Sequence, residues 1–397
     1  MGEFLEINTV FGQLNSLINL IENINKNVPF KQILEYIFNT FSKYIPYTHI
    51  GVALIEYDKK MVRASYGISS DNHKNLVSKM KGIEAYLDNT SLSKIVKNGE
   101  ERIINDLEEY VKGKPLKEYN KILIEEGIKS SITFPLKSNN KVIGIIFFSS
   151  NLKNIYKKEH IIFLRTLANS IALSLEKDIL IKDMIISSTL ALAKLTEERD
   201  SETGDHIYRI KKYSKMIAGF LSKEDKYKDI IDIEYIDNIE RFSPLHDIGK
   251  VAIPDEILLK SGKLTYEEFE IMKKHTIYGA KVLKTADEIL ERNGMSIYKM
   301  AIDIVEGHHE KWDGSGYPYG KKGEDIPLSA RIVAVADVFD ALTSKRPYKK
   351  PFSFEDTIKI IKEGSGNHFD PFIVDVFIKN INAIKSKYQN FKNNNIL

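Results

Sequence analysis

The pattern of apolar positions opens with a heptad repeat that runs through seven residues: Ile7, Val10, Leu14, Leu17, Ile21, Ile24 and Val28. Alternating steps of three and four residues are typical of a coiled-coil seam, and its β-branched members favour two strands. We therefore predict that residues 1–28 form a helix through which two chains associate. The alternative is an amphipathic helix that packs on its own domain.

Residues 29–155 mix helical and strand periodicity. The pattern predicts helices at Phe30–Tyr44 and Ser91–Lys97, and strands at His49–Tyr57, Met61–Ser65, Ser131–Leu136 and Val142–Ser149. The last two strands flank a polar turn, and their order resembles the closing hairpin of the GAF sensory domain. The expected fold here is an antiparallel sheet flanked by helices. His49 and His73 are expected at the surface or half buried, and no residue set specifies a ligand.

From Lys157 onward the periodicity is helical. One long helix without Gly or Pro covers Lys157–Lys194, so we assign residues 156–195 to a linker or signalling helix and 196–397 to an all-α domain. Within it, Thr265-Tyr-Glu-Glu predicts a capping box that opens the helix carrying His275. Ala330–Thr343 is apolar on its other faces, which predicts a buried helix with two carboxylates on one side.

The all-α region holds a set of ligand-type side chains. Its members are Glu202, His206, His246, Asp247, His275, His308, His309 and Asp337. Glu202 and His206 are spaced i, i+4 and share a face on a helix. The adjacent pair His308-His309 can reach one site only from a helix end or an irregular segment. Imidazole with carboxylate suits Fe, Mn or Zn, and more than four ligands indicate more than one ion.

These motifs together resemble the HD-GYP branch of the HD superfamily. The resemblance rests on Leu245–Lys250, Ile253–Asp255, Leu258–Lys260 and the whole of 308–318, and covers Thr196 to Pro351. It implies an all-helical fold and metal-dependent hydrolysis of cyclic di-GMP or a related cyclic dinucleotide. The local departure is Asp205, where a glycine is common.

The resemblance also implies roles for single residues. Two or three divalent ions per chain, Fe or Mn, would be held by the eight ligand residues, with Asp247 as the bridge and Glu202 completing a trinuclear site. Other implied roles are phosphate contacts at Lys250, Arg346 and Lys349, a substrate-side ring at Tyr317, and support of the ligand histidines by Asp200 and Asp340. Asp247 and Lys250 are the expected catalytic residues.

Length and composition limit the number of domains and the kinds of partner and metal site. The 397 residues allow two or three domains, and a net charge of +3 does not indicate a polyanionic partner. The absence of cysteine excludes disulfides and thiolate metal sites. Neither a signal peptide nor an apolar run of transmembrane length is present, so we expect a cytoplasmic protein with neither a membrane nor a nucleic acid polymer as partner.

The sequence thus predicts a dimeric, GAF-regulated and metal-dependent phosphodiesterase that opens cyclic di-GMP to linear pGpG, and further cleavage to GMP stays open. The loop Gly316-Tyr317-Pro318 is expected to present a surface to a diguanylate cyclase partner. Two alternatives stay open: an HD hydrolase of another nucleotide, and a catalytically weak regulator that binds cyclic dinucleotides.

Overall fold

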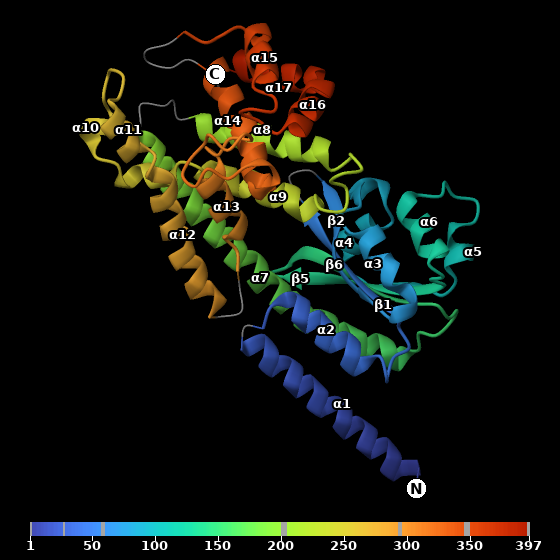
Figure 1. The fold of residues 1–397 in the computed structure, drawn as a ribbon. Helices are drawn as coiled ribbons and strands as arrows, with labels where there is room; N and C mark the ends of the chain where they lie inside the picture. The colour runs from blue at the N-terminus through green and yellow to red at the C-terminus, as the bar shows by residue number, and fades with distance from the viewer. Residues whose placement is uncertain are drawn as a thin grey trace. The chain divides into compact units, whose positions relative to one another are not determined.

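The computed structural model describes residues 2–26, 28–56, 60–199, 205–292, 296–344 and 350–394. The chain divides into two compact units, residues 1–182 and 183–397. Helix α7 (Lys158–Arg199) begins in the first unit and ends in the second (Figure 1). This confirms the predicted class, an α+β domain joined by a long helix to an all-helical one.

The first unit is built on a six-stranded antiparallel sheet with the order β3-β2-β1-β6-β5-β4. Its strands are β1 (His49–Glu56), β2 (Met61–Ser69), β3 (Glu84–Tyr86), β4 (Arg102–Ile104), β5 (Ser130–Ser138) and β6 (Lys141–Ser150). The predicted hairpin is confirmed as β5 and β6, which pair from Ser130↔Ser150 to Ser138↔Lys141. Asn139 and Asn140 supply its turn in the left-handed conformation that asparagine tolerates.

Helices cover both faces of this sheet. They are α1 (Gly2–Asn25), α2 (Phe30–Phe41), α3 (Lys74–Met80), α4 (Leu92–Asn98), α5 (Leu107–Val111) and α6 (Glu118–Glu125). Figure 1 shows α2 and the start of α7 along one face and α3 to α6 on the other. The main core lies on the α2–α7 face, where Phe30, Phe134, Phe148 and Leu167 are among the buried side chains.

Helix α1 packs on its own unit along part of the predicted seam. Leu17 packs against the core, and Leu20 and Ile24 are buried in it. The exposed apolar face consists of Leu14, Ile18 and Ile21. The prediction that all seam residues lie on one exposed face is therefore wrong, because Leu17 and Ile24 pack inward. The side chains of Ile7 and Val10 lie outside the described ones.

Two histidines of this unit are buried, contrary to the expectation of surface or half-buried positions. His49 is 4% exposed and its Nδ1 lies 2.7 Å from the hydroxyl of Ser69, its cross-strand neighbour. His73, at the end of a short 3-10 turn, is 8% exposed. Burial lowers the pKa of His49 to about 4, so this imidazole is neutral at pH 7.

The described regular secondary structure of the second unit consists of helices, apart from one isolated bridge between Ser365 and Phe369. Its helices are α8 (His206–Leu221), α9 (Ile233–Phe242), α10 (Asp255–Leu258), α11 (Tyr266–Met272), α12 (His275–Glu291), α13 (Lys299–Gly307), α14 (Leu328–Thr343), α15 (Phe354–Glu363), α16 (Pro371–Lys379) and α17 (Ile381–Asn393). Short 3-10 helices η4 (Ser243–Leu245) and η5 (Ile248–Ala252) connect α9 to α10. Together with the end of α7, helices α8, α9 and α12 to α17 enclose the main core, which is centred on α14. Helices α10 and α11 form a separate small cluster around Ile253, Ile257 and Leu258.

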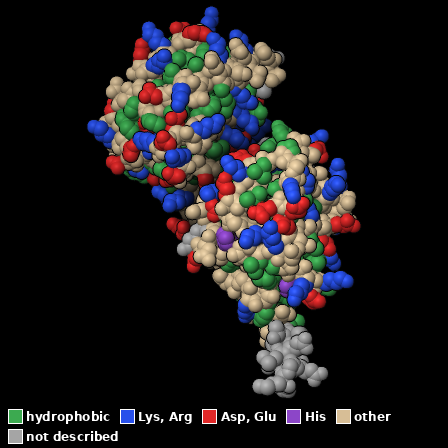
Figure 2. Space-filling view, turned by 90° about the vertical axis from the view of Figure 1, so that its right-hand side faces the viewer, with side chains coloured by type: hydrophobic (Ala, Val, Ile, Leu, Met, Phe, Trp, Pro, Cys, Tyr) green, Lys and Arg blue, Asp and Glu red, His purple; other side chains and the backbone are tan. Residues whose placement is uncertain are grey.

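Charge is spread over the surface. Figure 2 shows Lys and Arg side chains interspersed with Asp and Glu on the face it presents. That mixture is what 58 basic and 55 acidic residues predict. Among the described residues, no helix combines the length and the apolar character required to cross a membrane.

Candidate metal centre

Seven of the predicted ligands form two groups inside the second unit. Asp247, His275, His308 and His309 make one group, and His206, His246 and Asp337 make the other. Within each group the ligand atoms lie within 4.8 Å of one another. The two groups are in contact, because Asp247 Oδ2 is 3.3 Å from His246 Nε2 while Asp247 Oδ1 is 3.2 Å from His275 Nε2. Asp247 therefore straddles both groups.

Most of the ligands stand at the ends of helices. His206 and His275 begin α8 and α12, and His308 is the C-cap of α13. Asp337 is the exception, because it projects from within α14, the buried helix that the sequence predicted. Helix ends from several directions can therefore converge on one point, and the adjacent pair at 308 and 309 reaches it as the spacing required.

The helix that carries His275 begins later than predicted. The capping box at Thr265 is confirmed, but it opens α11, which ends at Met272. The chain then turns at residues 273–274, and α12 starts at the histidine itself. The prediction that the capped helix carries His275 is therefore wrong.

Two glycines allow the ligand-bearing segments to approach closely. A Cβ on Gly249 would overlap the carbonyl oxygen of His275, and one on Gly279 would lie 2.7 Å from Val305. No side chain fits between η5 and α12 at these points. The main chains themselves therefore set the distance between Asp247 and His275.

Three imidazoles share one orientation. Each places Nδ1 against a main-chain carbonyl one turn upstream: His246 on Ser243 at 3.0 Å, His275 on Met272 at 2.8 Å and His308 on Ile304 at 3.1 Å. A carbonyl only accepts, so Nδ1 donates the hydrogen bond and Nε2 is the nitrogen that faces the centre. The Nε2 atoms of His206 and His246 lie 3.3 Å apart, facing the same point.

The centre of the site contains buried polar atoms that have no hydrogen-bond partner among the described residues. These are Asp247 Oδ1, His275 Nε2 and His308 Nε2. Burial of such acceptors costs free energy unless something electropositive faces them. Two imidazole lone pairs beside a carboxylate oxygen are the donor set of a divalent metal ion, so the residues fit that cofactor.

The electrostatic environment shifts the pKa values of His246 and His309 in opposite directions. Burial disfavours a charged His246, but Asp247 and Asp337 outweigh it and raise its pKa to about 9. Burial and the neighbouring His308 hold the pKa of His309 well below its ordinary value. Although burial opposes ionisation of Asp247, Lys250 and His246 keep its pKa well below the usual range. The carboxylate is therefore ionised at neutral pH.

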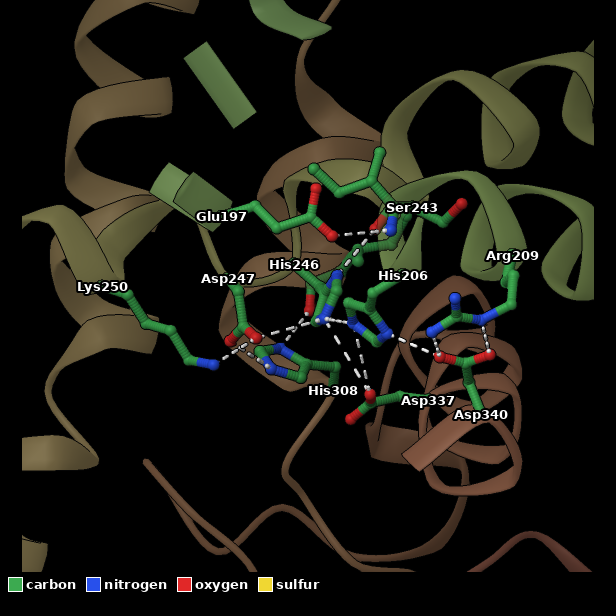
Figure 3. Close-up of polar contacts among 12 residues, drawn as sticks. Glu197, His206, Arg209, Ser243, His246, Asp247, Lys250, His308, Asp337 and Asp340 are labelled. Atoms are coloured by element: carbon green, nitrogen blue, oxygen red, sulfur yellow. Dashed lines mark hydrogen bonds and ion pairs between the residues drawn. The ribbon is translucent and has the colours of Figure 1, made fainter. Parts of the chain in front are cut away.

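Asp340 supports His206 from behind. Its Oδ2 lies 2.7 Å from His206 Nδ1, and Arg209 donates to both carboxylate oxygens at 2.6 and 2.9 Å (Figure 3). Burial opposes ionisation of Asp340, but His206 and Arg209 lower its pKa. Asp340 thus lies where it can orient the His206 ring, as the predicted supporting role requires. Arg209 was missed, although its i+3 spacing from His206 was a signal.

The loop after His309 folds over the first group. The Tyr317 ring lies against His309 with centroids 4.7 Å apart, and Phe269 of α11 meets its edge at 6.1 Å. A Cβ on Gly316 would overlap the amide nitrogen of Lys311, so only glycine permits this path. Tyr317 therefore lies beside the ligand group, where the sequence predicted a substrate-side ring.

The start of this loop is attached to the C-terminal part of the unit. The amides of Trp312 and Asp313 donate to the carbonyls of His368 and Asn367 at 3.1 and 2.9 Å. Arg331 lies over the Trp312 ring and pairs with Asp370 at 2.7 Å. Residues near position 370 therefore hold the loop that carries Tyr317.

The predicted cationic residues are only partly described. Lys250 lies in η5 with Nζ 2.8 Å from Asp247 Oδ2. The structure therefore pairs it with the bridging carboxylate, within reach of the site. Asp200, Glu202, Arg346 and Lys349 lie outside the described residues.

Residues 237–373 match the family model of the HD domain, and residues 28–176 match that of the GAF domain. The chain thus carries a GAF domain followed by an HD domain, and the HD domain implies divalent metal binding. A "Probable cyclic di-GMP phosphodiesterase" of Vibrio cholerae is 51% identical over 188 residues, 47% of this chain and 42% of the relative. The predicted resemblance is confirmed for these two domains.

Two further relatives are named for different cyclic dinucleotides. A cyclic di-GMP phosphodiesterase of Thermotoga maritima is 41% identical over 211 residues, 53% of each chain. The 3'3'-cGAMP-specific phosphodiesterase 2 of Vibrio cholerae is 43% identical over 188 residues, 47% of this chain and 33% of the relative. This chain therefore spans about half, or less, of the length of these curated relatives.

We expect Arg209→Ala to destabilise the second unit by roughly 3–5 kcal/mol, because it leaves the Asp340 carboxylate buried without its bidentate partner. Urea unfolding of the full chain measures the loss. Arg292→Ala, on an exposed arginine, is the control and should stay within about 0.5 kcal/mol. An unchanged midpoint for Arg209→Ala would contradict this account.

The same carboxylate predicts a pH dependence. Asp340 has a lowered pKa in the folded state, so its stabilisation is complete above the ordinary aspartate value of 3.8 and is lost as the pH falls through the lowered value. Wild type should therefore lose more stability than Arg209→Ala does when unfolding is repeated in increasingly acid solution.

Proposed function

We propose that the chain is a metal-dependent phosphodiesterase that hydrolyses cyclic di-GMP to linear pGpG and further to GMP. The observation that carries this proposal is the bridging position of Asp247 between two ligand groups that contain buried acceptors without partners among the described residues. The names of the relatives support the substrate. Hydrolysis of a phosphodiester suits a pair of neighbouring metal ions, which can serve the attacking and the leaving oxygen.

Bound ions would supply Lewis-acid polarisation of the phosphate and a lowered pKa for the attacking water. The residues that would hold them are His206, His246 and Asp337 on one side and Asp247, His275, His308 and His309 on the other. The protein's own contribution is orientation. The carbonyls behind His246, His275 and His308, and Asp340 behind His206, keep each imidazole aimed at the centre.

Substrate contacts in this proposal lie around the ligand groups. Tyr317 offers a ring beside His309, and Lys250 offers an ammonium group close to Asp247. Arg346 and Lys349 would add phosphate contacts, and a guanidinium suits bidentate phosphate binding. Relatives named for cyclic di-GMP and for 3'3'-cGAMP both match this chain, so a mixed dinucleotide is the nearest competing substrate.

Asp247→Ala should abolish hydrolysis of cyclic di-GMP while the unit stays folded, because no described neighbouring side chain bridges the two groups in its place. Asp375→Ala removes the same charge from the exposed face of α16 and should keep full activity. The assay resolves pGpG and GMP chromatographically and repeats with 3'3'-cGAMP, a nucleoside triphosphate and an alarmone.

The outcomes of that assay separate the candidate functions. Turnover in metal-depleted Asp247→Ala would refute the metal mechanism. Preference of wild type for a triphosphate or an alarmone would favour a different HD hydrolase. Binding of cyclic di-GMP without turnover would favour a regulator.

The metals in this proposal are Fe or Mn, and Glu202 adds a third ion to the two that seven ligands can hold. We expect about three ions per chain in wild type and about two in Glu202→Ala, because only one ion depends on this carboxylate. Anaerobic purification followed by elemental analysis provides the count. Glu198→Ala, with a carboxylate removed from an exposed position of α7, should keep the wild-type number. Equal counts of two in wild type and Glu202→Ala would exclude the trinuclear site.

The proposal also covers assembly and regulation. We place the protein in the cytoplasm as a homodimer, with the GAF domain as its regulatory input and the Gly316-Tyr317-Pro318 loop as a contact for a diguanylate cyclase partner. The exposed row Leu14, Ile18 and Ile21 on α1 supports association of two copies. Apolar residues at this spacing on one helix face can pack against the same face of a second chain.

Replacement of Leu14 and Ile18 by glutamate should shift the protein toward the monomer, because both side chains belong to the exposed face of α1. Sedimentation at micromolar concentration measures the shift. Leu116→Glu, at an apolar residue that is 54% exposed elsewhere in the unit, is the control and should leave the assembly unchanged. A wild-type chain that sediments as a monomer would rule out this dimer.

A further inference from the structure

The last turns of α7 contact three segments that lie next to candidate metal ligands. Glu197 contacts α8, which begins with His206, and Arg199 contacts the end of η5, which carries Lys250. Thr189 contacts Tyr298, the N-cap of α13, and α13 ends next to His308. The same helix buries Leu164 and Leu175 in the core of the first unit. One continuous helix is therefore shared by the sensory domain and the supports of the candidate metal centre.

Glu197 makes the contact closest to a ligand. Its Oε1 accepts the amide N–H of Ile207 at 3.2 Å, and Ile207 directly follows His206 in the first turn of α8. The N-cap residue of this helix, Asp205, makes no capping hydrogen bond with its side chain. Glu197 thus satisfies one of the amide groups that a helix start leaves without an intrahelical partner. A carboxylate there also interacts favourably with the helix dipole.

Glu197 is buried, which distinguishes it from its neighbour in the sequence. It is 8% exposed, whereas Glu198 is exposed. A cavity of about 20 Å³, room for roughly one water molecule, is lined by Ala193, Thr196 and Glu197 together with His206 and His246. The end of α7 thus lies across a small cavity from these histidines, and Figure 3 shows Glu197 on the same side of the site as His246.

Arg199 makes a second attachment two residues further along. Its guanidinium donates to the carbonyls of Val251 and Ile253, the latter at 3.3 Å, and to the Asp255 carboxylate. These acceptors lie just past Lys250. The end of α7 is thereby connected to both α8 and η5, the two elements that start beside His206 and Asp247.

We propose that Glu197 is a positioning residue through which α7 sets His206, so that regulation reaches the His206–His246–Asp337 group. The inference rests on the proposed function for its metal ions. Asp340 orients the His206 ring, while Glu197 holds the backbone from which the ring projects. A displacement of α7 therefore acts most directly on the group that contains His206.

The test is metal binding by the metal-free full chain, titrated with Co²⁺ and followed by visible absorption and calorimetry. Glu197→Ala should weaken one binding event about tenfold or more, the scale seen when support of a ligand is lost. The other binding events should remain as in wild type. Glu197→Gln should restore the affinity, because its amide oxygen can accept the same N–H. Glu198→Ala removes a neighbouring charge from the exposed face and should match wild type.

Kinetics separates positioning from general damage to the fold. With Glu197→Ala, turnover of cyclic di-GMP should fall at limiting metal and recover when metal is in excess, with KM little changed. Equal weakening of all binding events together with a lowered melting temperature would indicate a structural role and overturn the inference. Wild-type affinity in Glu197→Ala would overturn it as well. A wild-type chain that binds no Co²⁺ would instead refute the proposed function.

Discussion

The second unit depends on the cost of gathering seven buried or half-buried ligand side chains around a common centre. Imidazole nitrogens and carboxylate oxygens face one another there, and Asp247 Oδ1 and two Nε2 atoms find no hydrogen-bond partner in the described part of the unit. Protein interiors rarely tolerate such acceptors uncompensated. The arrangement is therefore stable when cations occupy the centre, and the rest of the unit serves to keep these atoms in place.

The surrounding structure meets this constraint mainly with main-chain atoms. Carbonyls orient three of the imidazoles. The close main-chain contact between Gly249 and His275 sets the distance between Asp247 and His275. Side-chain support is concentrated at His206, through Asp340 and Arg209. The end of α7 contacts the same side of the centre, where Glu197 accepts the amide N–H of Ile207.

Most of the fold and of the ligand set could be predicted from the sequence. Histidine and aspartate at their characteristic spacings indicate a metal site without any knowledge of distances, and alternating apolar residues predicted the hairpin β5–β6. Spacing alone could not separate α11 from α12, because the turn before His275 contains no Gly or Pro. Nor could it show that Leu17 packs inward on its own unit, since a heptad does not reveal which surface covers it. The roles of Arg209 and Glu197 could be recognised only from their buried hydrogen-bond partners in the structure.

The attachment of the Tyr317 loop to residues 367 and 368 has a consequence for biosynthesis. The amides of Trp312 and Asp313 donate to carbonyls of residues 368 and 367, which follow helices α14 and α15 in the sequence. A ribosome extends the chain from the N-terminus, and domains generally fold as units in that order, so the GAF domain is complete before these carbonyls exist. The loop over the ligand groups can close only after residue 368 has been added. The first unit of a nascent chain can therefore fold before its metal centre can be assembled.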